Sequence, residues 1–569
     1  MLAPVTTDAD RPVRGPWGAL AGALIGAAFF AWVAGSRVLD PTEIDWLMKG
    51  DWVPHYFGWH YFRSEPWHWP PGAVHGYYAP LGTSIGLTDS IPLIGYLLKP
   101  FSGWLPTPFQ YLGPFLLASF ALQGALGARL IGRRVDSLSA QALGAALFVL
   151  LPTLLIRVGH AALCAHWLIL WALLLATREP RTRHAPRAWA LLGLVAAMVQ
   201  PYLAAMVLGV LGATAASGSG TPLLRRGGAL AAAVAATLAG WWISGLFLLD
   251  GSGSLAAGGL GYYSMNLLAF VSPGDWSAFL PPLPVAFDGQ AYEGFQYLGL
   301  GILGLLGAAL AYGTVRRGRA GATAPQRRLW PPVLVLACLG MAAFAVSPVV
   351  TLGSRTIANF DGAWTAPLAL FRSSGRFVWP LVYVMLTSAV VTVVLRAPGR
   401  LGLAVLAGAV VVQLVDLAGA HAFRRQVARD PAFHAWADPF ADARWSTVAE
   451  TYGHLVLVPP PQCGPAPVPY EGAIGLTARH GLTINAGVVA RRDEGALAGY
   501  CAALDAEIDG ARLRDDTLYI VSSAAAAILS GQAGASVTCG TIGGVWFCTT
   551  PAARARWRDR AAADRWIDP

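Results

Sequence analysis

The chain has 569 residues, of which 55% are hydrophobic and only 12% are charged, and its mean hydropathy is +0.51. Soluble proteins carry about 25% charged residues, so this composition excludes an ordinary soluble domain and predicts a mostly α-helical protein that crosses a membrane many times. The formal net charge is +9, but the arginines gather in short loops between apolar runs, so we expect no nucleic-acid partner.

Apolar runs and basic loops alternate along the chain, and together they predict about eleven membrane-spanning helices. Short basic loops mark the cytoplasmic side, which places the N-terminus in the cytoplasm and the C-terminal tail in the periplasm of a bacterial inner membrane. The first run has no evident signal-peptide cleavage site, so we expect it to stay in the membrane as an anchor. The predicted spans are 17–38, 108–131, 138–157, 160–177, two within 188–216, 228–249, 298–315, 330–350, 377–395 and 401–418. The supporting basic clusters are Arg133–Arg134, Arg178–Arg187, Arg225–Arg226, Arg316–Arg328 and Arg396–Arg400.

The run 188–216 is too long for one span, and the sequence Gln-Pro-Tyr interrupts it at Gln200. Proline removes a backbone donor and disfavours continuation of a helix. We therefore predict two short spans that meet at Gln200 on the external side. A single kinked helix is the alternative.

Two domains are predicted. Residues 1–424 form a transmembrane module with large periplasmic loops at about 39–107, 250–297 and 351–375. Residues 425–569 alternate strand-like segments such as "HLVLVPP" with helix-like segments such as "EGALAGYCAALDAEI", a pattern typical of an α/β domain.

Four of the six cysteines lie in this C-terminal domain, at positions 463, 501, 539 and 548. An even number of cysteines in a segment placed outside the cytoplasm predicts two disulfides. Of the three possible connectivities we favour Cys463–Cys501 with Cys539–Cys548. A zinc site made by all four thiolates is the rival interpretation, although no close Cys-x-x-Cys pair supports it.

The first external loop begins with an unusual aromatic stretch, "GDWVPHYFGWHYFRSEPWHWP" at residues 50–70. On a helix Asp51 and His55 share a face with Trp59. We expect the amphipathic rings of this stretch to lie flat at the membrane surface, namely those of Trp52, Tyr56, Trp59, Trp67 and Trp69. A partly desolvated Asp51 could act as a general base. The alternative is that Asp51 caps the helix.

Two more acids of this loop are ambiguous. Asp89, in "TDSIPL", is either a site residue or a cap for the apolar stretch that follows it. Asp45 is either a site residue or a solvated loop charge.

The third external loop ends in "FRSSGRFVWP", with Arg372 and Arg376 four residues apart. Paired guanidiniums suit a phosphate or pyrophosphate. Anchoring of the next span is the alternative, but positive charge on the outer side runs against the topology bias. The sequence contains no P-loop, G-x-S-x-G or H-E-x-x-H motif.

These segments carry a resemblance. A first helix, a large acidic external loop, many spans and a C-terminal external domain resemble the GT-C superfamily of membrane glycosyltransferases. More narrowly, "GDWVPHYFGWHYFRSEPW", "TDSIPL" and "FRSSGRFVWP" resemble signature segments of one bacterial GT-C-like family, over nearly the whole chain.

The resemblance implies inverting transfer of a sugar from a polyprenyl-phosphate donor to a periplasmic glycan, lipid or protein acceptor. It implies a first-loop base, which is Asp51 here, with Asp45 as second choice and His55 orienting the base. The adjacent acidic pair common in protein mannosyltransferases is missing, so a need for a divalent cation such as Mg²⁺ or Mn²⁺ stays open and no residue is assigned to a metal. The expected substrate-binding residues are Asp45, Asp89, Trp59, Arg63, Gln200, Tyr202, Glu293, Arg372, Ser374 and Arg376.

Three other functions stay open on the sequence. A lipid-linked oligosaccharide polymerase or ligase would also place arginines on a pyrophosphate. A lipid or glycan transporter would use the same charges to line a pathway, although no internal repeat supports it. A non-catalytic assembly subunit would use its external domain to bind a partner.

Overall fold

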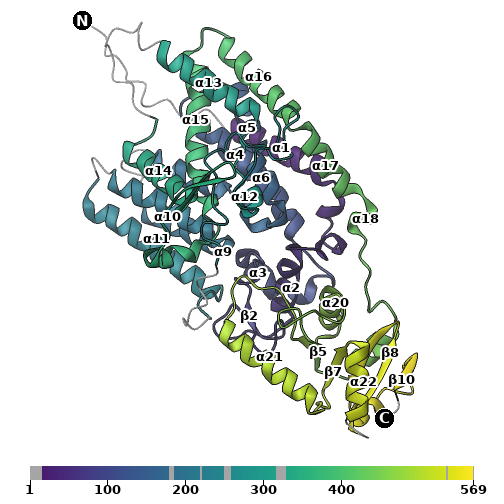
Figure 1. Cartoon of the computed structure of the whole chain (residues 1–569). Coiled ribbons are helices and arrows are strands. Elements are labelled where there is room, and N and C mark those ends of the chain that lie inside the picture. The colour runs from purple at the N-terminus through teal and green to yellow at the C-terminus, as the bar shows by residue number, and fades with distance from the viewer. Residues whose placement is uncertain are drawn as a thin grey trace, which may run out of the picture. The chain divides into compact units, whose positions relative to one another are not determined.

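The computed structural model describes residues 16–178, 185–217, 221–248, 258–315, 329–532 and 536–567 (Figure 1). The chain divides into two compact units. Unit 1 contains Met1–Asp40, Leu112–Leu238 and Gly258–Asp430, and unit 2 contains Pro41–Tyr111, Ala239–Ala257 and Pro431–Pro569. The predicted basic positions 179–184 and 316–328, and the start of the predicted second loop at 250–257, lie outside the described residues.

Unit 1 is mostly helical. Its N-terminal half contains α1 (Trp17–Ala34), η2 (Arg37–Leu39), α4 (Leu112–Ile131), α5 (Leu138–Val149), α6 (Pro152–Leu155), η5 (Ile156–Gly159), η6 (Ala161–Cys164), α7 (Trp167–Ala176), α9 (Pro186–Val199), α10 (Pro201–Ala216) and the first part of α11 (Leu223–Ile243). Its C-terminal half contains α12 (Gly289–Tyr292), α13 (Leu300–Val315), α14 (Pro332–Val346), β3 (Val349–Leu352), β4 (Arg355–Asn359), η7 (Ala363–Phe371), η8 (Ser374–Val378), α15 (Trp379–Arg396), α16 (Leu401–Asp416) and α17 (Ala418–Arg429). The helices fall where the apolar runs predict them.

Glycines allow α1 and α4 to pack backbone against backbone. A Cβ atom at Gly22 would lie 2.2 Å from the carbonyl oxygen of Gly124, and one at Gly26 would lie 2.0 Å from that of Phe120. Glycines spaced by four residues permit this close approach between helices in a membrane.

The break at Gln200 is present as predicted. Gln200 has extended backbone angles (φ −160°, ψ 122°) between α9 and α10, so the run 188–216 forms two helices. Its side-chain oxygen accepts a hydrogen bond from the backbone N–H of Tyr202 at 3.3 Å, which caps the second helix.

Three helices in the described residues are long and apolar enough to cross a membrane: Trp17–Ala34, Leu112–Ile131 and Ser374–Arg396. The count rises to five if the bent pairs Leu138–Val149 with Pro152–Gly159 and Leu401–Asp416 with Ala418–Arg429 are each one span. This count does not reach the predicted eleven, because several apolar helices are 10–17 residues long. A helix of 16 residues rises only about 24 Å.

Unit 2 combines the first predicted external loop with the C-terminal segment. The loop contains η3 (Asp45–Leu47), α2 (Trp52–Ser64), β1 (Ala73–Val74), β2 (Thr83–Ser84), α3 (Pro92–Leu98) and η4 (Lys99–Trp104). The C-terminal segment contains α18 (Pro431–His434), α19 (Arg444–Ala449), β5 (His454–Val458), α20 (Tyr470–His480), β6 (Thr483–Ile484), α21 (Glu494–Asp509), β7 (Thr517–Val521), α22 (Ser523–Gln532), β8 (Thr538–Ile542), β9 (Val545–Thr549), α23 (Pro551–Ala555) and β10 (Arg565–Ile567).

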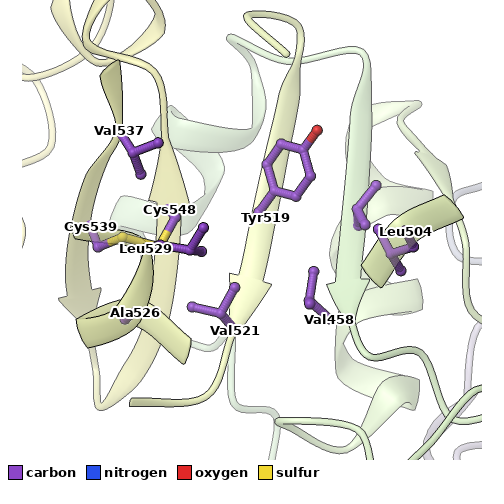
Figure 2. Packing of buried hydrophobic residues seen from close by; sticks show 10 residues of the cluster. Val458, Leu504, Tyr519, Val521, Ala526, Leu529, Val537, Cys539 and Cys548 are labelled. Carbon is purple, nitrogen blue, oxygen red and sulfur yellow. A yellow bond between two sulfur atoms is a disulfide. The ribbon is translucent and has the colours of Figure 1, made fainter. Parts of the chain in front are cut away.

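The C-terminal segment folds around a mixed six-stranded sheet of order β10-β8-β9-β7-β5-β6, in agreement with the predicted α/β domain. β5 is parallel to β6 and β7, whereas the β10–β8, β8–β9 and β9–β7 pairs are antiparallel. One side of the sheet buries Tyr519 and Val521 of β7 against α21 and α22, which contribute Leu504 and Leu529 (Figure 2).

The first loop pairs with the β6 edge of this sheet. Ile484 donates its backbone N–H to the carbonyl oxygen of Gly76 at 2.8 Å, and Ala79 donates to the carbonyl oxygen of Ile484 at 2.8 Å. Tyr61, on α2, contacts the hydroxyl of Thr477, on α20, at 2.7 Å. Unit 2 therefore combines the first loop with the C-terminal segment, which begins at Pro431. The predicted domain boundary at 424/425 stays a prediction.

Both predicted disulfides are present. Cys463 bonds to Cys501, and Cys539 bonds to Cys548. The second bond joins residues that lie opposite each other on β8 and β9 and belong to the buried cluster (Figure 2).

The two disulfides should differ in their effect on stability, because they close loops of 38 and 9 residues. In the chain-entropy model, replacing Cys463 and Cys501 by serine costs about 4 kcal/mol, and replacing Cys539 and Cys548 costs about 2.6 kcal/mol. Pulse proteolysis of the full chain over a urea series, following the C-terminal fragment, measures both losses. The control is Cys338→Ser, which changes a buried free cysteine of unit 1 and should leave the urea midpoint of the C-terminal fragment unchanged. A larger loss of stability from removing Cys539–Cys548 than from removing Cys463–Cys501 would contradict the chain-entropy model.

Candidate functional site

A buried ion cluster lies in unit 1 around Glu293, directly after α12. Arg157 donates from Nη1 to Glu293 Oε2 at 2.8 Å, and Arg376 donates from Nε to the same oxygen at 2.9 Å and from Nη2 to Oε1 at 2.6 Å. The three residues are 0%, 7% and 7% exposed, for Arg157, Arg376 and Glu293. Two guanidiniums therefore share one carboxylate away from water.

This environment determines the charge of Glu293. Burial alone would raise the pKa of its carboxyl group, but Arg376 and Arg157 hold that pKa well below its usual value. His160 adds its Nε2 atom at 3.6 Å from Oε1. Glu293 is consequently an anion that organises cations, and it is poorly suited to take up a proton.

Arg157 also fixes the backbone around the carboxylate. Its Nη2 donates to the carbonyl oxygens of Tyr292 at 2.8 Å and of Glu293 at 2.9 Å. Its guanidinium carbon lies 5.1 Å from the ring centre of Tyr292, close enough for a cation–π contact. Arg376 makes a similar contact with Tyr202, at 4.6 Å.

A close backbone approach brings Arg376 to Glu293. A Cβ atom at Gly375 would lie 3.0 Å from the Cα atom of Gly294, so glycine is needed where the two segments cross. Gln296 then donates to the carbonyl oxygen of Gly375 at 2.9 Å and accepts from the indole N–H of Trp379 at 3.1 Å. These contacts explain why "SGRFVW" and "EGFQ" fold together.

The other predicted residues of the third loop lie beside this cluster in different roles. Arg372 is half-buried with its guanidinium carbon 5.7 Å from the ring centre of Tyr263, and among the described residues no carboxylate lies within ion-pair distance of it. Ser374 is fully buried and donates to the carbonyl oxygen of Ala345 at 3.3 Å. Tyr202 accepts from the backbone N–H of Ser373 at 3.2 Å through its hydroxyl. Arg372 and Arg376 thus do not form an equivalent pair, since Glu293 binds only the second.

An apolar cavity of about 790 Å³ opens next to these residues in unit 1. Its lining is Ala343, Phe344, Val346, Ser347, Pro348, Val350, Phe360, Asp361, Trp364 and Leu368. Phe344 packs against Phe377 with ring centres 4.8 Å apart, and Phe377 follows Arg376 in the chain. The cavity and the arginine-bearing segment are therefore in contact.

In unit 2 the predicted acids have different environments. Asp51 occupies the N-cap position of α2, is exposed, and makes no side-chain capping bond, which disagrees with the capping interpretation. Asp45 is partly buried at the start of η3. Asp89 has a left-handed backbone (φ 58°) and precedes Ile91, the N-cap of α3, which is also left-handed (φ 49°). Asp89 therefore does not cap that helix, and it belongs to a strained turn of the kind that clusters at functional sites.

His55 is 2% exposed, and its Nε2 lies 3.9 Å from Asp89 Oδ2. The imidazole predicted to orient Asp51 thus lies next to the other acid of the loop.

Two predicted substrate-binding residues of α2 are buried inside unit 2. Trp59 is 1% exposed and donates from its indole N–H to the carbonyl oxygen of Phe109 at 3.2 Å. Arg63 donates to the carbonyl oxygens of Ser102, Leu105 and Pro106 at 2.8, 3.2 and 3.0 Å. These contacts hold the end of η4 and the chain that follows it, and they account for the burial of both side chains. The expectation that the aromatic rings lie on the membrane surface is wrong for Trp59 and for Tyr56, which is only 3% exposed. Trp67 and Trp69 are 53% and 78% exposed, and for them the expectation stays a prediction.

Sequence reasoning missed Arg157. A signal for Arg157 was present, because it is an arginine inside the predicted span 138–157, where a charge is costly and has a functional or structural partner by default. No local pattern pointed to Glu293 as that partner.

Two protein-family models match the chain. A model described as "Domain of unknown function (DUF6311)" matches residues 23–418, and a second, "DUF6311 C-terminal domain", matches residues 444–550. The chain belongs to the DUF6311 family. Among proteins with curated functions, none matches it. The first match contains the whole Glu293 cluster and the candidate acids Asp51 and Asp89.

The ion cluster predicts a large loss of stability for Glu293→Gln. This change leaves two buried guanidiniums without their shared anion, which costs about 3–5 kcal/mol. Thermal unfolding of the detergent-solubilised chain, followed by tryptophan fluorescence, should show a much lower Tm. The matched control is Asp288→Asn, an exposed acid five residues earlier that makes no side-chain capping bond.

The pH dependence of this loss follows from the lowered pKa. Because the pKa of Glu293 is lower in the folded protein than in the unfolded chain, its ionised carboxylate stabilises the fold. This stabilisation is fully present above the pKa of the unfolded chain, about 4.3, and is lost as the pH falls through the pKa of the folded protein. The difference in Tm between the wild type and Glu293→Gln should therefore be constant from pH 8 to about pH 5 and shrink in stronger acid. Equal stability of the two proteins at pH 7 would show that the cluster does not stabilise unit 1.

Proposed function

We propose that this DUF6311 protein is a membrane glycosyltransferase of the GT-C type. It moves a sugar, with inversion, from a polyprenyl-phosphate donor to a glycan, lipid or protein acceptor at the periplasmic face of a bacterial inner membrane. In this proposal the chain crosses the membrane about eleven times, with the shorter apolar helices among the spans and the C-terminal domain in the periplasm. The observation that carries the proposal is the contact between an apolar cavity and an arginine-bearing segment in unit 1.

The cavity suits the isoprenoid part of such a donor. Eight of its ten lining residues are apolar or aromatic, and the exceptions are Ser347 and Asp361. Burial of apolar surface yields about 25 cal/mol per Å², so a long hydrocarbon chain gains affinity from such walls without any directional bond. Phe360 and Trp364 are each 62% exposed, which gives lipid-borne ligands access to apolar surface.

The phosphate of the donor is assigned to Arg372. Arg372 lies in the segment that follows η7, whose residues Trp364 and Leu368 line the cavity. A guanidinium forms two parallel charge-assisted bonds with a phosphate, and as the glycosidic bond breaks it stabilises the charge that develops on the leaving phosphate. Arg376 acts as a positioning residue, because Glu293 holds its guanidinium and thereby the start of α15.

The general base is assigned to the first loop. The acceptor hydroxyl loses a proton to a carboxylate while its oxygen attacks the anomeric carbon and the carbon–phosphate oxygen bond breaks. The sequence favours Asp51, whereas the strained turn and the nearby imidazole of His55 favour Asp89. We assign the role to Asp89 and keep Asp51 as the alternative to be tested.

The base assignment predicts unequal effects of two isosteric changes. Asp89→Asn should lower the turnover of a polyprenyl-phosphate sugar by about 10²- to 10⁴-fold, the usual contribution of a general base, while donor binding stays normal. Asp51→Asn should stay within a few-fold of the wild type. Consumption of radiolabelled donor by purified protein in nanodiscs with added envelope acceptors measures both, and the opposite ranking would move the base to Asp51.

The donor site predicts a specific loss for Arg372→Ala. A hydrogen bond to a charged group contributes about 1.5–3 kcal/mol, so affinity for a polyprenyl phosphate should fall by about 10- to 100-fold. Arg372→Lys should recover part of it. The matched control Arg355→Ala, on the exposed strand β4, should bind normally.

A second variant tests the cavity. Ala343→Phe should weaken binding of a long polyprenyl phosphate and leave a short, water-soluble isoprenyl phosphate unaffected. Binding of labelled lipids to nanodisc-embedded protein reports both constants. Absence of binding would overturn the proposal, and a strict preference for a pyrophosphate-linked glycan would replace it with the polymerase or ligase alternative.

A further inference from the structure

A second cavity, of about 300 Å³, lies within unit 2 at the end of α2. Residues 60–76 of the first loop and residues 477–483 of the C-terminal segment line it. The lining includes a carboxylate and three imidazoles, those of His60, His68 and His75. Neither the transferase proposal nor the sequence patterns use these groups.

Glu65 organises this end of the cavity. Its Oε1 accepts the backbone N–H of Gly76 at 2.7 Å, and its Oε2 accepts the backbone N–H of His75 at 2.9 Å. The same Oε2 lies 3.1 Å from His68 Nε2. The carboxylate therefore ties the loop back to α2 and brings two imidazoles together, with ring centres 4.4 Å apart.

We propose that Glu65, His68 and His75 form a zinc-binding site. Zinc–nitrogen bonds of about 2.0–2.1 Å and zinc–oxygen bonds of about 2.0–2.2 Å in tetrahedral geometry separate the two ligand atoms by roughly 3.3 Å. The His68 Nε2 to Glu65 Oε2 distance of 3.1 Å already matches this value. A zinc ion would take the place of the proton between these two atoms.

The third ligand requires the ring of His75 to turn, because the possible ligand atoms of Glu65, His68 and His75 do not all lie within 4.8 Å of one another in the described residues. Two imidazoles on one tetrahedral zinc have ring centres about 5 Å apart by the same bond lengths, against 4.4 Å here. His75 is exposed, so its ring can turn without disturbing buried neighbours. Tetrahedral zinc with three protein ligands keeps a fourth position for water or a ligand.

The donor set selects the metal. Two imidazoles and one carboxylate suit zinc and similar transition metals, whereas Mg²⁺ and Ca²⁺ prefer oxygen ligands. The backbone N–H groups of His75 and Gly76 fix the orientation of the carboxylate, which is how surrounding groups tune metal ligands. Since the site joins the turn after β1 to α2, bound zinc would also stabilise the loop that carries Asp89.

The test is a zinc titration of the full chain. Protein in detergent is stripped with EDTA, and Zn²⁺ is added in competition with a fluorescent chelator. We expect His68→Ala and His75→Ala each to remove one bound zinc per chain relative to the wild type, and Glu65→Gln to weaken that site by tenfold or more. X-ray absorption should show a first shell at about 2.0–2.1 Å containing imidazole.

The control is His454→Ala, because His454 also lies beside a carboxylate, with Nε2 3.6 Å from Asp516 Oδ2. This variant should keep the zinc stoichiometry of the wild type. Because His75 is exposed, His75→Ala retains the fold, which circular dichroism of the stripped protein confirms. Unchanged zinc binding in His75→Ala would overturn the proposal without bearing on the transferase function.

Discussion

The carboxylate of Glu293, shared by Arg157 and Arg376, is the interaction on which the rest of unit 1's site depends. Removing one partner of a buried ion pair leaves an uncompensated charge, so the three side chains stabilise one another as a set. Their bonds also join three distant segments: η5, the end of α12, and η8. The sequence separations are 136 and 83 residues, so the cluster holds together segments that lie far apart in the chain.

The Glu293 cluster gives Arg376 and Arg372 different roles. Arg376 is bound through two of its nitrogens to Glu293 and stacks on Tyr202, so it holds η8 and the start of α15 in place. Gly375 permits that geometry because a side chain there would meet Gly294. Arg372, four residues earlier, lies on Tyr263 next to the segment that lines the apolar cavity. In the proposed function, Arg376 therefore holds this segment in position and Arg372 contacts the phosphate of the donor.

Local patterns predicted local structure well. Apolar runs located the helices, the Gln-Pro pair located the break at Gln200, and the even number of C-terminal cysteines led to both disulfides. The same patterns did not predict the burial of side chains that occur both at membrane surfaces and in protein interiors. Trp59 and Arg63 suit a membrane surface and a protein interior equally in sequence, but only the fold shows that they pack inside unit 2. The partner of Arg157 was beyond prediction for another reason, because no periodicity links residues 136 positions apart.

The pairing of the first loop with β6 gives the C-terminal domain a physical role. An unpaired sheet edge exposes backbone donors and acceptors, and here Gly76 and Ala79 satisfy Ile484 instead. Tyr61 and His60 extend the contact to α20 through Thr477 and the carbonyl oxygen of Ala478. The turn with Asp89 is strained, and such backbone persists only where surrounding structure over-determines it. Ser90, next to Asp89, donates to the carbonyl oxygen of Pro54 at 3.3 Å within the loop. Ala490 donates its backbone N–H to the carbonyl oxygen of Leu87 at 2.7 Å, so the C-terminal domain also helps to hold the chain just before this turn.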